Sequence, residues 1–102
     1  MTLSNDRKKY LRSIGHRLNP VVTVATKGLS EPVLAEIDRA LSDHELIKVK
    51  ISVGDRDQKK QVISDICSQL KADEVQTIGH ILLIHRAAKK PNPKLSNLLR
   101  VI

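Results

Sequence analysis

The stretch ELIKVKISV, residues 45–53, alternates apolar and polar side chains from Ile47 onward. This period of two is typical of a β-strand with one buried face, and Gly54 ends the pattern. The residues expected to face the core are Ile47, Val49, Ile51 and Val53. Lys48, Lys50 and Ser52 are expected to point to the opposite face.

Helical patterns flank this strand on both sides. Ser30 is expected to cap a helix whose first turn holds Glu31 and Pro32. Asp55 or Asp57 is expected to cap another helix. The buried side of the first helix would hold Val33, Leu34, Ile37 and Leu41, and that of the second Val62, Ile63, Ile66, Cys67 and Leu70.

Further out, residues 21–24 predict a short strand, and residues 75–78 and 81–85 predict two more. The pair Gly79-His80 suits a two-residue hairpin with glycine first. A helix is expected between a Ser4 cap and Gly15, with Tyr10, Leu11 and Ile14 packed along one face.

The predicted fold class is therefore α/β: a compact single domain with a mixed four-stranded sheet and three helices in the order α-β-α-β-α-β-β. Two strand–helix–strand units imply parallel neighbouring strands with right-handed crossovers, and the last hairpin adds an antiparallel strand. Residues 1–86 are expected to form the domain. Residues 87–102 predict a basic, flexible tail, although Leu95, Leu98 and Leu99 could dock as one late helical turn.

The positive charge lies at the two ends of the chain. Residues 1–29 hold six Lys/Arg against one acid, and residues 86–102 hold five against none, while the whole 102-residue chain has a formal net charge of +7. A polyanion such as nucleic acid is the natural partner of such a charge distribution. A single cysteine and the lack of a long apolar run predict a cytoplasmic protein that does not enter a membrane. No sequence feature indicates the oligomeric state, and a monomer is favoured.

The sequence holds no pattern of catalytic or metal-binding residues. The four histidines and Cys67 show no paired spacing of the kind that zinc sites use, so no metal and no cofactor is expected. Asp55 and Asp57 are better explained by helix capping, and Cys67 by core packing. We therefore expect a protein that is not an enzyme.

The segment VTVATKGLSEP, residues 22–32, joins a strand to a helix. Its glycine-bearing bend can direct successive amides at a phosphate, with the charge of Lys27 beside them. Glu31 repels an anion at the helix start, so contact is expected at Thr26, Lys27 and Gly28 instead. A plain connecting turn remains the alternative at this point.

Two stretches resemble a known family: LSNDRKKYLRSIGHRLNPVVTVATKGLSEPVLAEIDRALSDHELIKVKI and IGHILLIHR, which lie within about residues 2–86. They are similar to the CRM domain (chloroplast RNA splicing and ribosome maturation), and in particular to stand-alone bacterial proteins of the YhbY type. The resemblance implies a mixed α/β fold similar to the C-terminal domain of bacterial translation initiation factor three. It also implies RNA binding linked to assembly of the large ribosomal subunit, with ribosomal RNA or its precursor particle as partner.

The family's GxxG loop falls on Ala25, Thr26, Lys27 and Gly28, with alanine in place of the first glycine. His85 stands where the family usually has tyrosine, and Arg86 matches. The resemblance groups the loop with cations of the first helix and the turn after it, so that the expected RNA-binding residues are Arg7, Lys8, Arg12, His16, Arg17, Thr26, Lys27, Gly28 and Arg86.

Two other functions remain open from sequence. A protein-interaction module would dock on ribosomal proteins or assembly factors through the acidic surface of Glu31, Glu36, Asp38, Asp43 and Glu45. A general DNA-coating protein would bind duplex DNA as tightly as structured RNA.

Overall fold

A computed structural model describes residues 4–25 and 28–98. The elements in chain order are α1 (Asn5–Gly15), β1 (Pro20–Val24), α2 (Glu31–His44), β2 (Leu46–Ile51), α3 (Arg56–Leu70), β3 (Asp73–Ile78) and β4 (Ile81–His85). Three helices and one four-stranded mixed sheet confirm the predicted class and element order. None of the helices in the described part combines the length and apolar character that a membrane crossing requires.

Each helix begins at a side chain that accepts a hydrogen bond from the backbone. Ser4 Oγ accepts from Arg7 N at 3.1 Å, and Ser30 Oγ accepts from Val33 N at 3.4 Å. Asp55 Oδ1 accepts from the N–H of residue 58 at 2.7 Å, so Asp55 is the cap of α3. Caps of this kind stabilise a helix by about 1 kcal/mol each.

The strand order is β1-β2-β4-β3, with β1 parallel to β2 and β4 antiparallel to both β2 and β3. The prediction that β2 and β3 are neighbours was therefore wrong, because β4 lies between them. The reason is burial: Leu82 and Ile84 enter one core while Leu83 enters the other, so β4 needs cover on both faces. In contrast, β3 carries Glu74 on the sheet edge, where a charged side chain reaches water.

The β3–β4 connection is the predicted two-residue hairpin. Ile78 pairs with Ile81 across it, and Gly79 has φ +57 while His80 does not have a positive φ. This combination corresponds to a type II′ turn, which matches the twist of the flanking strands.

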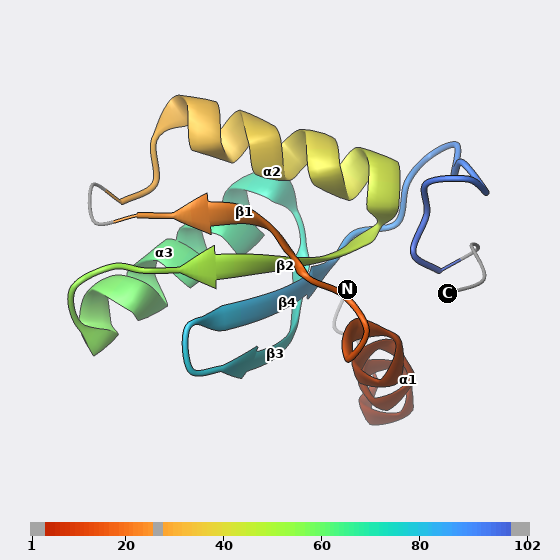
Figure 1. Cartoon of the computed structure of the whole chain (residues 1–102), viewed down its shortest axis with the longest axis horizontal. Coiled ribbons are helices and arrows are strands. Elements are labelled where there is room, and N and C mark those ends of the chain that lie inside the picture. The colour runs from red at the N-terminus through yellow and green to blue at the C-terminus, as the bar shows by residue number, and fades with distance from the viewer. Residues whose placement is uncertain (1–3, 26–27, 99–102) are drawn as a thin grey trace.

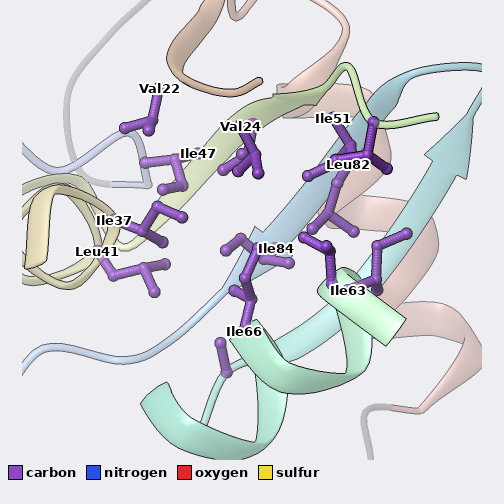
Figure 2. Packing of buried hydrophobic residues seen from close by; sticks show 14 residues of the cluster. Val22, Val24, Ile37, Leu41, Ile47, Ile51, Ile63, Ile66, Leu82 and Ile84 are labelled. Atoms are coloured by element: carbon purple, nitrogen blue, oxygen red, sulfur yellow. The ribbon is translucent and has the colours of Figure 1, made fainter. Parts of the chain in front are cut away.

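The main core lies between α2, α3 and one face of the sheet. Ile37 and Leu41 from α2 meet strand residues such as Val24 and Ile84, and Ile63 and Ile66 complete the layer from α3 (Figure 2). The four predicted inward residues of the opening stretch, Ile47, Val49, Ile51 and Val53, are all buried in this cluster.

A second, smaller core lies on the other sheet face under α1. Leu11, Leu46, Val75 and Leu83 are buried there. Helix α1 lies beside the start of β1, apart from α2 and α3 (Figure 1). One short helix covers only part of this face, so the remainder stays open.

A sharp corner joins α2 to β2 at Glu45. This residue has φ +63 and is only 5% exposed. Its carboxylate accepts hydrogen bonds from Ala88 N at 3.1 Å and from Ser96 Oγ at 2.8 Å. The corner thus receives the segment that follows β4.

The described part of residues 87–102 returns to the domain at this corner instead of extending away from it. Asn97 donates from its backbone N–H to the His44 carbonyl at 2.9 Å and from Nδ2 to the Leu46 carbonyl at 2.6 Å. Leu98 packs against the second core, whereas Leu99 lies outside the described residues. The domain boundary at residue 86 stays a prediction.

Candidate nucleic-acid interface

Helix α1 and the turn after it carry five of the residues predicted to bind RNA. Leu11 is fully buried against the sheet, so the polar positions of the helix face outward. Arg7, His16 and Arg17 are exposed, and Lys8 and Arg12 are half-buried. The helix therefore forms a cationic ridge beside the sheet.

Tyr10 was expected to pack in the core, and this prediction was wrong. Its side chain is 49% exposed, and the Arg7 guanidinium lies 5.2 Å from the centre of its ring. Leu11 takes the inward position because neighbouring residues on a helix point about 100° apart. The chain's only aromatic side chain is thus available to solvent and in contact with a cation.

The open part of the sheet adds two lysines that the sequence analysis did not select. Lys48 and Lys50 alternate with the buried residues of β2 and so share the sheet face that α1 partly covers. Lys50 is exposed and Lys48 is half-buried. The alternation in residues 45–53 had already placed both lysines on this face. They were not selected as RNA-binding residues because they lie far in the sequence from the two basic ends of the chain.

A cavity of about 200 Å³ lies where α1 meets the open sheet. Gly15 brings the helix close to the sheet, since a Cβ at this position would lie 2.6 Å from Leu83 Cδ2. The residues that line the cavity are Arg12, Gly15, His16, Lys48, Gln76, Ile78, Ile81 and Leu83. This lining contains cations and no carboxylate.

The bend between β1 and α2 is a tight turn. The Gly28 N–H donates to the Ala25 carbonyl at 2.8 Å, and Gly28 has φ +82. Ala25 does not have a positive φ, so the backbone at this position does not need glycine. Thr26 and Lys27 lie outside the described residues, so their proposed phosphate contacts remain predictions.

The structure does not bring this bend beside α1. Helix α1 leads into the beginning of β1, whereas Ala25 and Gly28 lie past its far end (Figure 1). Lys50 pairs in register with Thr23, close to that far end. The predicted cations of α1 and Gly28 thus lie toward opposite ends of β1, and Lys48 and Lys50 pair with β1 between them.

Arg86 is bound within the domain. Its Nη1 donates to Asp38 Oδ1 at 2.7 Å and to the Leu70 carbonyl at 3.0 Å. Its Nη2 donates to the Asp38 carbonyl and to Ser42 Oγ, both at 2.9 Å. The guanidinium joins α2 to the end of α3, and it is not part of the open face.

His85 is buried at the end of β4 and is only 7% exposed. Burial lowers its pKa from the ordinary value of 6.5, and the Arg7 cation lowers it further, against a smaller opposite effect from carboxylates. Within the described residues its Nδ1 has no hydrogen-bond partner. His85 therefore has no surface from which to stack on a base or bind a phosphate.

Cys67 has the properties of a core residue. It packs against the main core, and burial, aided by Glu74 and Asp73, raises the pKa of its thiol to about 11. A neutral thiol is a poor nucleophile. In the described ranges, no group of three or more metal-ligating side chains comes together.

The acidic surface of the protein-interaction alternative is smaller than the sequence suggested. Glu45 is buried and bound to the C-terminal segment, and Asp38 is paired with Arg86. Glu31 and Glu36 remain exposed on α2.

The fold and the site define a class of protein: a small α/β domain in which two helices cover one sheet face and basic side chains lie on and beside the other. The model of the CRS1 / YhbY (CRM) domain matches residues 3–86, and the chain belongs to this family.

Similar proteins agree with this assignment. The chain is 49% identical over 100 residues to "Probable RNA-binding protein PA4753" of Pseudomonas aeruginosa, covering 98% of this chain and 96% of that one. It is 48% identical over 94 residues to a protein of Haemophilus influenzae named "RNA-binding protein", covering 92% and 95%. The solution structure of SAV1595 from Staphylococcus aureus is 31% identical, with a TM-score of 0.76 over 87% of this chain and 93% of that one.

Proposed function

We propose that this protein binds structured RNA and associates with ribosomal RNA of the large subunit during its assembly. The observation that carries the proposal is the open sheet face, where Arg12, Lys48 and Lys50 lie with no carboxylate in the adjoining cavity. The family membership and the names of the relatives support RNA as the polyanion. The protein acts by binding, without catalysis, in the cytoplasm.

Phosphate contacts supply the affinity in this proposal. An RNA backbone would follow the open face from α1 to the bend after β1, with Lys48 and Lys50 in the middle. Binding through charge weakens as the salt concentration rises. The logarithm of the binding constant falls linearly with the logarithm of the salt concentration, and each lost phosphate contact makes this fall less steep by about 0.7 to 0.9.

The test is a pair of charge-reversal variants with the same change in net charge. Lys48→Glu with Lys50→Glu removes the centre of the open face. Arg56→Glu with Lys60→Glu, on exposed positions of α3, changes the opposite side of the sheet. The first variant should lose at least about tenfold in RNA affinity at physiological salt and show a smaller salt slope. Equal losses in both variants would mean that only net charge matters and would refute the assigned face.

The RNA partner is tested by crosslinking in cells, with the crosslinked nucleotides mapped. Enrichment on precursor RNA of the large subunit supports the proposal. A featureless spread over messenger RNA, or crosslinks to ribosomal proteins without RNA, contradicts it.

A further inference from the structure

The cavity between α1 and the open sheet has a composition that phosphate binding does not explain. Its floor is aliphatic: Ile78 is 64% exposed, and it pairs across the hairpin with Ile81 beside the buried Leu83. An apolar side chain exposed to this extent gains free energy when a flat apolar surface covers it. The floor therefore favours a ligand with an uncharged face.

The rim of the cavity is polar and unsatisfied. Arg12, Lys48 and Gln76 line it, and in the part of the chain that the structure describes none of their side chains makes a hydrogen bond or ion pair. Lys59 and Arg86, in contrast, are bound within the domain: Lys59 donates to the Gly79 carbonyl, and Arg86 has four acceptors. The rim holds two cations and one amide that can both donate and accept.

We propose that this cavity holds one unpaired nucleotide of the bound RNA strand, an inference that rests on the proposed RNA-binding function. The base lies on Ile78 and Ile81, and the Gln76 amide bonds to its edge. Arg12 and Lys48 bind the adjoining phosphate. A volume of about 200 Å³ has room for a single base, with its sugar and phosphate at the cationic rim, whereas a paired base cannot present its face to the floor.

This site replaces aromatic stacking by aliphatic contact. RNA-binding sheets commonly stack unpaired bases on exposed aromatic residues, but this chain has no Phe and no Trp. Tyr10, its only aromatic residue, does not line the cavity. Ile78, which is exposed, and the partly buried Ile81 are the apolar platform that the open face offers beside its cations.

The test compares two RNAs with the same number of phosphates, one a hairpin with an unpaired loop and one a continuous duplex. The wild-type protein should prefer the hairpin. Ile78→Ser should lower affinity for the hairpin about five- to tenfold, with unchanged duplex affinity and salt slope, because it removes apolar contact and no charge. Val21→Ser, at a side chain that is 51% exposed on β1, is the matched control and should keep the preference.

A second measurement does not depend on one variant. Methyl NMR shifts during titration with the hairpin RNA should be largest at Ile78 and Ile81, and a free mononucleotide should produce the same shifts only at much higher concentration. A mononucleotide that binds as tightly as the hairpin would reassign the cavity to free nucleotides and overturn the inference.

The outcomes separate the two proposals. RNA binding that persists with no preference for unpaired loops, or with equal losses in Ile78→Ser and Val21→Ser, overturns the nucleotide site alone. A wild-type protein that binds neither RNA overturns the proposed function, and the nucleotide site with it.

Discussion

Replacing Arg86 by alanine separates a role in RNA binding from a role in the fold. The resemblance to CRM proteins assigns Arg86 to the RNA surface, whereas the structure shows its guanidinium bound to α2 and to the end of α3. The two roles predict different losses, one in RNA affinity and the other in the free energy of unfolding.

The expected loss of stability follows from the four hydrogen bonds. Asp38 is 54% exposed, so its ion pair with Arg86 contributes only about 0.5–1 kcal/mol. The bonds to Ser42 and to two backbone carbonyls contribute about 1 kcal/mol each. Because the four bonds share one group and are not additive, Arg86→Ala should lower the free energy of unfolding by about 2–4 kcal/mol.

Thermal and urea denaturation, followed by circular dichroism, measure this loss. The expected decrease corresponds to a Tm about 10–25 °C lower for a domain of this size. Arg39→Ala is the matched control, because this exposed arginine of α2 makes no described side-chain bond, and it should change stability by about 0.5 kcal/mol or less. Arg86→Lys keeps the charge but cannot reproduce the planar fork, so it should recover less than half of the loss.

RNA affinity, measured well below the lowered Tm, decides between the roles. The structural role predicts that folded Arg86→Ala binds RNA within about twofold of the wild type, since the residue lies off the open face. An unchanged Tm together with a large loss of RNA affinity would refute this reasoning and restore Arg86 to the RNA surface.

Three further predictions concern His85, Cys67 and Gly15. The folded-state pKa of His85 lies below its unfolded value, so the unfolded chain binds more protons in acid. Stability should therefore fall as pH drops below about 6.5, and urea denaturation of His85→Gln should show a flatter pH profile. Burial raises the pKa of Cys67 to about 11, so a disulfide reagent at pH 8 should label the native thiol far more slowly than the thiol in urea. A fast native reaction would contradict this environment. Gly15→Ala places a Cβ against Leu83 and should cost about 1–3 kcal/mol in urea denaturation; no loss would show that the helix moves away freely.

The helices and strands could be predicted because local patterns determine them. Ser30 and Asp55 are caps at the positions where their side chains reach a backbone N–H three residues on. The alternation of β2 places Val49 in the core and Lys50 on the open face because successive strand side chains point to opposite sides.

The neighbours of each strand could not be predicted from local patterns. Strand β4 lies between β2 and β3 because its two faces both need cover, a requirement that depends on the whole sheet. Glu45 was expected on an acidic surface, yet it is buried by residues about 50 positions later in the chain. No pattern among neighbouring residues predicts a contact between residues so far apart in the sequence.

The candidate site was predicted in part. The cations of α1 were identified because they are dense near the end of the chain. Lys48 and Lys50 were missed because acidic residues nearby in the sequence outweigh them when charge is summed along that segment. The structure separates these charges, because Glu31 and Glu36 lie on α2 while the lysines lie on the open face. The candidate RNA-binding surface is therefore defined by the separation of acidic and basic side chains in the fold, more than by the net charge of the chain.

The docking of the C-terminal segment at Glu45 connects residues beyond the matched family region to the domain. The family model matches residues 3–86, and Ser96 and Asn97, which follow that range, donate hydrogen bonds to the Glu45 carboxylate and to the Leu46 carbonyl. Proteolytic removal of everything after residue 90 would keep the residues of every helix and strand, but it would remove the Ser96 and Asn97 donors and expose the Glu45 carboxylate to water. Ser96 and Asn97 therefore support the corner between α2 and β2, although they lie in no helix or strand themselves.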